Sequence, residues 1–131
     1  MLSNSGVFDY INVLGTSLDA TAKRGTVIQN NIANSQTPNY KRKDIRFETE
    51  LKHAFAKSSE DTVDARVKHL DLEALGNSEV YTDYEELSYR YDGNNVDINN
   101  ENAIFAKVQI KYNGLMTVLN KDFENLQAVM K

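Results

Sequence analysis

Mostly apolar side chains recur in alternating steps of four and three residues near the start of the chain, and no other feature of the sequence constrains the fold more strongly. The positions are Val7, Ile11, Leu14, Leu18, Thr21, Gly25, Ile28 and Ile32. Because an α-helix turns once in about 3.6 residues, this spacing places them on one face. It predicts one helix from Val7 to Ile32, about 40 Å long. Asn4 or Ser5 is expected to cap its start, and Pro38 bounds its end because proline forces the preceding residue out of the α region.

A second series of apolar side chains at helical spacing occupies the last part of the chain. It consists of Phe105, Val108, Tyr112, Leu115, Leu119, Leu126 and Val129, and it is widened by Ile104, Met116, Phe123 and Met130. This pattern also predicts one long helix. Asn99 is the expected N-cap, and Glu101 lies in the first turn, where the helix dipole favours an acidic side chain.

Two long helices at the ends of one chain can bury their apolar faces against each other. The predicted fold is therefore mainly α, with the terminal helices packed as a coiled-coil-like pair and a small irregular or β segment between them. A length of 131 residues fits one domain rather than two with separate cores. The expected parts are residues 1–38 (N-terminal helix and turn), 39–97 (middle segment) and 98–131 (C-terminal helix).

The first half of the middle segment contains a basic cluster and a short periodic pattern. The basic cluster is Lys41, Arg42, Lys43 and Arg46. Phe47, Leu51, Ala54 and Phe55 follow at helical spacing and predict a short amphipathic helix. Ser58–Asp64 is polar and is expected to be mobile, and no pattern defines a conformation for residues 57–80.

The second half of the middle segment is rich in tyrosine. Between Val80 and Tyr91, the alternation of Leu87, Tyr89 and Tyr91 before the turn signal Asp92-Gly93 predicts a strand. The tyrosine group, Tyr81, Tyr84, Tyr89 and Tyr91, fits either one face of a small sheet or the centre of an interface.

The N-terminal helix has the apolar seam of a packed helix without the propensity of an independent one. Ordering its backbone costs at least as much as burial of its few large apolar side chains supplies. Gly15 and Gly25 lower its helix propensity further, although such small residues let another helix approach closely. The helix is therefore expected to need partners and to fold on assembly.

The rest of this helix carries polar side chains that are uncharged. They are Asn12, Thr16, Ser17, Thr26, Gln29, Asn30 and Asn31, whereas the charged residues are only Asp9, Asp19, Lys23 and Arg24. A solvated helix usually carries more charge, which favours contacts on several sides. The alternative is a hairpin within the chain, with the first seam packed on the second, and both can hold together.

Composition argues against several other kinds of protein. Fifteen basic and nineteen acidic side chains give a formal net charge of −4, whereas nucleic-acid binding draws on an excess of positive charge. No apolar run approaches the roughly 18 residues of a spanning helix, and no secretory signal pattern is visible, so direct lipid binding is not expected. The absence of cysteine excludes disulfides and suits either the cytoplasm or passage through an oxidising space.

The sequence gives no support for catalysis, a cofactor or a metal. His53 and His69 are the two histidines, and neither lies in a triad or metal-ligand spacing. Asp92–Asp97 has some oxygen ligands of a calcium loop, but Val96 and Asp97 occupy positions that need an oxygen ligand and a glycine. This stretch is instead expected to form a turn followed by a helix cap.

The most distinctive stretch is Asn30-Asn31-Ile32-Ala33-Asn34-Ser35-Gln36-Thr37-Pro38-Asn39-Tyr40-Lys41-Arg42. It resembles the signature of flagellar axial proteins, the rod, hook and hook-associated class, in which a long helix ends in Asn-Ile-Ala-Asn and turns through Thr-Pro-Gly-Tyr into a basic residue. Asn39 stands at the glycine position, and asparagine is the next-best residue for a positive φ, so the turn is expected to survive.

Within that class, the short chain and the Asp92–Asp97 stretch look like the flagellar basal-body rod proteins of the proximal rod. The resemblance implies a structural subunit that polymerises through its terminal helices and is exported by the flagellar type III apparatus to the periplasmic rod. Its partners would be copies of itself, other rod proteins and membrane-ring or export-gate components at the rod base. The residues expected at subunit interfaces are Val7, Ile11, Leu14, Leu18, Ile28, Ile32, Asn34, Pro38, Tyr40, Lys41, Arg42, Phe105, Val108, Tyr112, Leu115, Leu119, Leu126 and Val129.

Two alternatives remain at the level of sequence. The basic cluster could meet Asp83, Glu85 and Glu86 of an adjacent subunit, or it could form a solvated loop. The whole chain could also be a soluble helical binding module, such as a flagellar secretion chaperone or adaptor, that presents its stripe to one partner.

A monomeric peptide covering residues 1–36 should show little helix by circular dichroism in dilute solution, because its seam has nothing to pack against. A strongly helical monomeric peptide would contradict the expectation that this end of the chain folds on assembly.

Overall fold

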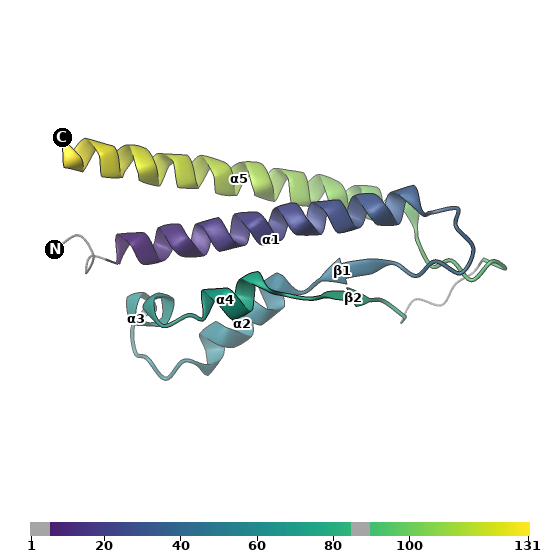
Figure 1. Cartoon of the computed structure of the whole chain (residues 1–131), viewed down its shortest axis with the longest axis horizontal. Helices are drawn as coiled ribbons and strands as arrows, with labels where there is room; N and C mark the ends of the chain where they lie inside the picture. The colour runs from purple at the N-terminus through teal and green to yellow at the C-terminus, as the bar shows by residue number, and fades with distance from the viewer. Residues whose placement is uncertain (1–5, 85–89) are drawn as a thin grey trace.

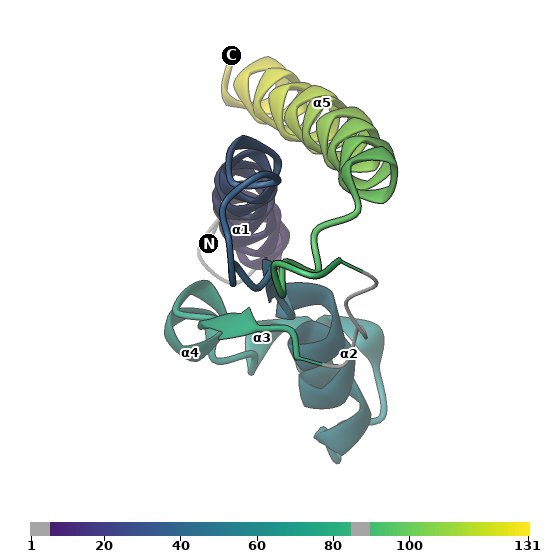
Figure 2. The same cartoon turned by 90° about the vertical axis from the view of Figure 1, so that its right-hand side faces the viewer.

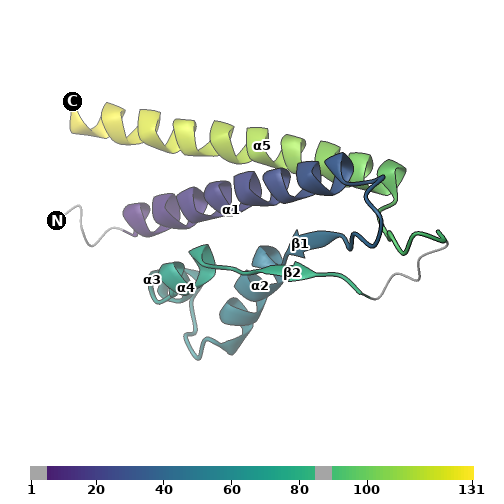
Figure 3. The same cartoon turned by 45° about the vertical axis from the view of Figure 1, so that its right-hand side comes forward.

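The two terminal helices lie side by side and run in opposite directions, as the computed structural model of residues 6–84 and 90–131 shows (Figures 1 and 3). Helix α1 spans Val7–Ala33 and helix α5 spans Ile98–Met130. The middle segment lies against α1 on the side away from α5, so α1 is the central layer of three (Figures 1 and 2). The prediction of a mainly α fold with paired terminal helices is confirmed.

Helix α1 begins where the sequence predicts but with a different cap. Gly6 holds the N-cap position with a φ of 72°, and no side chain caps the helix. The predicted caps, Asn4 and Ser5, lie outside the described residues. The helix ends at Ala33, before Pro38, and the amide of the C-cap residue Asn34 makes the last helical hydrogen bond, to the Asn30 carbonyl at 3.1 Å.

Helix α5 begins earlier than its apolar pattern and is capped by Asp97. The Asp97 carboxylate accepts hydrogen bonds from the amides of Asn99 at 3.0 Å and Asn100 at 3.2 Å. The prediction of Asn99 as the cap is wrong. A carboxylate two residues earlier can accept both free amides at once and also interacts favourably with the helix dipole.

Helix α1 is covered on two faces. Towards α5, buried Gly25 lies against Val108, and a Cβ added at Gly25 would be 3.5 Å from the Val108 Cγ1. Towards the middle segment, Ala20 joins a core of buried residues from three other elements, Ile45, Phe47 and Leu75, with Val27, Leu51, Leu70 and Leu72 around it. This cluster of buried apolar side chains therefore lies between α1 and the middle segment.

This second face accounts for part of the uncharged polar surface of α1. Ser17 and Asn31 are buried, and Thr16 is half-buried. By contrast Asn12, Thr26, Gln29 and Asn30 remain exposed. The contact within the chain thus occupies one side of the helix and leaves the other uncharged side open.

The middle segment is a small two-stranded sheet with three short helices. Strand β1 (Lys43–Ile45) pairs antiparallel with β2 (Val80–Thr82), with Asp44 opposite Tyr81. Between them are α2 (Phe47–Lys57), α3 (Val63–Lys68) and α4 (Leu72–Gly76), so residues 57–80 contain two short helices, α3 and α4. The amphipathic helix predicted from Phe47 is confirmed, whereas α3 begins inside the stretch expected to be mobile.

The predicted strand from Val80 to Tyr91 is too long. The strand spans only Val80–Thr82, where it pairs with β1, and one further backbone hydrogen bond joins the Asp83 amide to the Arg42 carbonyl at 2.9 Å. Leu87 and Tyr89 lie outside the described residues, and Tyr91 lies in the turn before Gly93. The division at residues 38 and 97 into three parts stays a prediction.

In the described residues no helix combines the length and apolar character needed to cross a membrane.

Replacing Gly25 by alanine should stabilise the subunit by up to about 1 kcal/mol, because the added methyl group fits against Val108 and raises helix propensity. Gly25→Leu should instead destabilise it by about 1–3 kcal/mol, because the larger side chain forces α1 and α5 apart. Gly15→Leu is the matched control, since no atom lies within 4 Å of an added Cβ there. Urea unfolding measures each change, and equal effects of leucine at both positions would contradict close packing at Gly25.

Candidate functional site

The distinctive stretch after α1 folds as a sharp turn, which we call the signature turn, residues 34–40. The Thr37 amide donates to the Asn34 carbonyl at 3.0 Å, and the Tyr40 amide donates to the Thr37 carbonyl at 3.3 Å. Asn39 has a φ of 60°, the only positive φ of a non-glycine residue in the described part of the chain. The prediction that asparagine takes a positive φ at this position is confirmed.

Residues 92–95 clamp the signature turn from outside. The Asn94 side-chain amide donates to the carbonyls of Asn34 at 2.9 Å and Thr37 at 2.8 Å, and the Asn39 amide donates to the Asp92 carbonyl at 2.7 Å. Gly93 has a φ of 77°, and a Cβ there would lie 2.7 Å from the Asn39 Oδ1, so any other residue would be strained at this position. The predicted turn followed by a helix cap is confirmed.

Asn31 ties the end of α1 to β1 and α5. It is fully buried, and its side-chain amide donates to the Lys43 carbonyl at 2.7 Å and the Glu101 Oε2 at 3.1 Å. Its Oδ1 accepts from the Lys43 amide at 2.9 Å and the Tyr40 hydroxyl at 3.1 Å. Asn31 thus completes the outer edge of β1 as a neighbouring strand would.

Arg42 and Glu101 form the centre of a buried charge network. The Arg42 Nε donates to the Glu101 Oε1 at 2.5 Å, and its terminal nitrogens donate to Asp83 at 3.0 Å and Asp44 at 3.3 Å. Burial alone would lower the pKa of Arg42, but its hydrogen bond to Glu101 and the nearby carboxylates hold that pKa above its ordinary value. The guanidinium therefore stays charged inside the fold.

Asp44 carries this network to α1. Arg24 donates to both Asp44 oxygens, from Nε at 2.8 Å and from a terminal nitrogen at 3.1 Å. Burial raises the pKa of Asp44, but hydrogen bonds from Arg24 and the Ile45 amide outweigh it and hold the pKa below its ordinary value. The two-pronged contact fixes β1 against α1.

The basic cluster is therefore not the free patch that either sequence alternative assumed. Asp83, the acidic partner expected on an adjacent subunit, pairs with Arg42 inside the same chain. Lys41 donates to the Gly93 carbonyl at 2.5 Å, and Arg46 stacks 4.0 Å from the centre of the Tyr81 ring. Lys43 is exposed, and Glu85 and Glu86 lie outside the described residues.

The tyrosine group does not share one face of the sheet. Tyr81 is half-buried beneath Arg46, whereas Tyr84 and Tyr91 are exposed and Tyr89 lies outside the described residues. The alternative of one sheet face is therefore wrong for the described tyrosines, of which only Tyr81 lies in a strand, and the interface alternative stays a prediction.

The predicted interface residues fall into three sets by exposure. Buried within the chain are Ile11, Ile28, Arg42 and Val108. Half-buried are Leu14, Leu18, Ile32, Asn34, Tyr40, Lys41, Phe105, Tyr112, Leu115, Leu119 and Leu126, and exposed are Val7, Pro38 and Val129. The fold brings Phe105, Val108 and Tyr112 to the α1 face that includes Gly25. Contact of these residues with neighbouring subunits stays a prediction.

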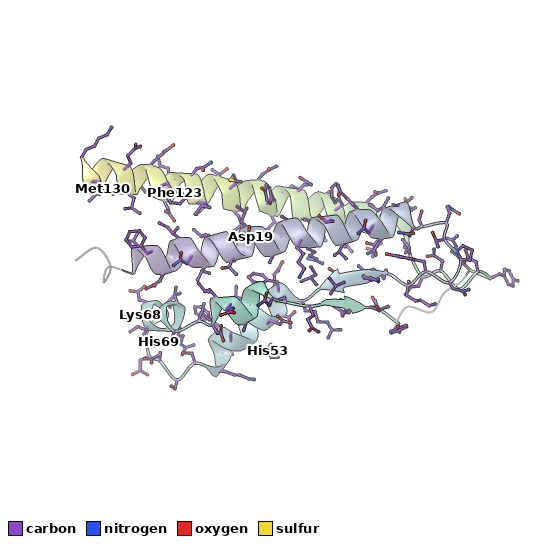
Figure 4. All side chains as sticks on the ribbon, in the orientation of Figure 1. Asp19, His53, Lys68, His69, Phe123 and Met130 are labelled. Atoms are coloured by element: carbon purple, nitrogen blue, oxygen red, sulfur yellow. The ribbon has the colours of Figure 1, made fainter. Side chains whose placement is uncertain are left out.

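The two histidines lie apart from this network. His53 is exposed on α2, and the His69 Nδ1 lies 3.1 Å from a Glu60 carboxylate oxygen on the surface (Figure 4). Across residues 6–84 and 90–131, no three potential metal ligands come together.

Sequence reasoning missed Asp44 and Glu101 as buried partners of Arg42. It also missed Arg24 and Asn31, which join this network from α1 through Asp44 and Glu101. One signal was present: Glu101 precedes Ile104 by three residues and Val108 by seven, so it lies on the apolar face of α5. A carboxylate on such a face needs a buried cation.

The chain is similar to curated proteins named flagellar basal body rod protein FlgB. It is 32% identical to that of Bacillus subtilis over 120 residues, which cover 92% of each chain. It is 30% identical to that of Salmonella typhimurium over 126 residues, with 88% of each chain covered, and 32% identical to that of Borreliella burgdorferi over 122 residues, with 87% and 90% covered. No protein-family model matches the sequence.

Paired terminal helices, the signature turn and these similarities together define a rod protein of the flagellar basal body, as the sequence motif predicted. Within that class the chain belongs to the FlgB family.

Replacing Glu101 by glutamine should destabilise the subunit by about 3 kcal/mol, because Arg42 remains charged and buried without its central partner. Glu124→Gln is the matched control, since its ion pair with Lys121 is exposed and should contribute less than about 0.5 kcal/mol. Urea unfolding of both variants measures the difference. If Glu101→Gln were as stable as the control variant, the network would not hold α5 in place.

Proposed function

We propose that this chain is a structural subunit of the bacterial flagellar basal-body rod and that it polymerises through its two terminal helices. Membership of the FlgB family supports the role in the rod. The observation that carries polymerisation is the exposure of α5, a helix of 33 residues in which only Glu101 and Val108 are buried. A long amphipathic helix with so little cover inside its own chain has surface available for neighbouring helices.

The apolar surface is concentrated where the two helices end. We define the open end as Val7 and Phe8 on α1 with Phe123, Val129 and Met130 on α5, all of them exposed. The start of α1 and the end of α5 lie at this end of the molecule, and Figure 4 labels Phe123 and Met130 there (Figures 1 and 4). A group of apolar side chains at one end of a molecule is typical of an interaction site, whereas single scattered ones are not.

The half-buried seam residues extend this surface along the helix pair. Leu14 and Leu18 on α1, with Leu115, Leu119 and Leu126 on α5, are each covered only in part by their own chain. Neighbouring α-helices would complete their burial, as in a bundle of more than two helices. The axial contacts of the rod are therefore assigned to the seam and the open end, with exposed Pro38 as a contact at the opposite end.

The finer setting follows from the resemblance to rod proteins. The partners are copies of this chain, other rod proteins and membrane-ring or export-gate components at the rod base, and the location is the periplasmic rod, reached through the flagellar type III apparatus. A chain without cysteine can pass an oxidising space without forming disulfides, which supports this route. The role is structural rather than enzymatic, since the buried charges of the described part are paired with one another.

Val129→Asp should strongly reduce incorporation of the subunit into basal bodies, because it places a charge in the open end. Val129 is 77% exposed, so the change should leave the stability of the isolated subunit within about 0.5 kcal/mol. The variant is produced in a strain of a flagellated species whose own FlgB protein has been deleted. The measurements are the amount of the variant in isolated basal bodies and the swimming of the cells.

Ala56→Asp is the matched control for this test, because it adds the same charge at an exposed position of α2, outside the helix pair. If Val129→Asp entered basal bodies in normal amounts, the open end would not be part of the surface through which the subunits assemble. Failure of the unaltered chain to enter basal bodies at all would overturn the proposed role in the rod.

A further inference from the structure

A groove runs along one side of the helix pair, between α1 and α5. Its volume is about 230 Å³, and its walls include Ala22, Gly25 and Thr26 from α1 with Phe105, Val108 and Tyr112 from α5. Gly25 and Val108 are buried, whereas Ala22 and Thr26 are exposed at the rim. An apolar cavity of about 150 Å³ accommodates benzene, so this groove has room for a branched aliphatic side chain.

The groove carries no charge, which makes it inexpensive to desolvate. None of its lining residues is an aspartate, glutamate, lysine, arginine or histidine. Its rim belongs to the uncharged side of α1 that the middle segment leaves open, with Thr26 and Gln29 exposed. A charged partner would gain no ion pair here, whereas an apolar side chain would gain burial.

The same chain presents a side chain of the required kind on another face. Ile110 is 74% exposed on α5. It follows Gln109, which lines the groove, and one residue turns the helix by about 100°, so Ile110 faces away from the groove. Three of its four neighbours one turn away on that face, exposed Ala106, Asn113 and Gly114, are small and uncharged, and the fourth is exposed Lys107. Ile110 therefore projects from a face that another helix pair can approach closely.

We propose that Ile110 of one copy of the chain inserts into the α1–α5 groove of the next copy. This inference rests on the proposed function and adds a specific lateral contact to it. The projecting side chain and the groove lie on different faces of one helix pair, so the contact is heterologous. Each copy that is added to one end of a growing assembly still has either a free Ile110 or a free groove for the next copy. Such a contact adds further copies, in a ring or an open helical polymer, rather than closing as a dimer.

A second copy fits this groove better than a partner of opposite charge. Each copy carries a formal net charge of −4, so copies repel one another unless they meet through uncharged surface. The groove supplies such surface, and the face around Ile110 carries one exposed charge, that of Lys107.

Disulfide cross-linking tests the proposal, because the full-length chain has no cysteine of its own. Thr26→Cys at the groove rim is combined with Ala106→Cys in one double variant and with Asn113→Cys in another, which leaves Ile110 in place. Ala106 and Asn113 lie about one turn to either side of Ile110, so one of the two pairs comes within reach in either direction of approach. The variants are produced in a strain of a flagellated species whose own FlgB protein has been deleted, and isolated basal bodies are oxidised mildly.

The expected result is a ladder of cross-linked copies for one double variant, at least about tenfold more abundant than for either single variant, since a disulfide forms only between closely placed Cα atoms. Ile110→Ser in the cross-linking background should abolish the ladder. Thr26→Cys with Ala56→Cys is the control for chance collision, because Ala56 lies on α2.

Three outcomes would overturn the proposal. The first is that each double variant enters rods but forms no more cross-links than the controls. This result would show that the contact does not exist, and the proposed function would stand. Equal cross-linking of the single variants would indicate a symmetric contact instead. Exclusion of the unaltered chain from basal bodies would overturn the proposed function and this inference together.

Discussion

The buried ion pair between Arg42 and Glu101 is the contact on which the rest of the structure depends. It joins residues 59 positions apart in the chain, one after the signature turn and one in the first turn of α5. Asn31 adds hydrogen bonds from α1 to both sides of this junction. Burying these charges is unfavourable unless every group is paired, and in the described part of the chain no buried side-chain nitrogen or oxygen lacks a partner. A shift of α5 along α1 would leave Arg42 uncompensated, so the network selects one register that an apolar seam alone would not.

This network lets a thin molecule hold two long helices together at one end. The apolar core around Ala20, Ile45 and Phe47 lies between α1 and the middle segment, so it contributes nothing directly to α5. Helix α5 is attached through the network, the contact of Val108 with Gly25, and an ion pair between Lys111 and Glu48. The rest of α5 is only half-buried or exposed, and its residues in the open end are exposed. Strong anchoring at one end and apolar exposure at the other suit a subunit that completes its packing against neighbours.

The elements with strong local signals were predictable from sequence. Periodicity defined α1 and α5, helical spacing after Phe47 defined α2, and the resemblance of residues 30–42 to axial proteins led to the FlgB family. The positive φ of Asn39 was predictable because asparagine stands where the axial-protein signature has glycine, and asparagine tolerates that conformation better than most residues. The predictions were wrong where contacts between segments far apart in the chain decided the structure. Asp97 replaced Asn99 as a cap, β2 was shorter than its alternating pattern, and Asp83 turned out to pair inside the chain.

The sequence by itself determined which segments are helical, where the chain must turn, and which family the chain resembles, because these depend on local spacing and on residue types at fixed positions. Only the tertiary structure decided that Arg42, Asp44, Asp83 and Glu101 share one buried site, that α1 is the central layer, and that Ile110 faces away from the groove beside it. The physical reason is that charge pairing and burial depend on distances between segments far apart in the chain. No local pattern records those distances.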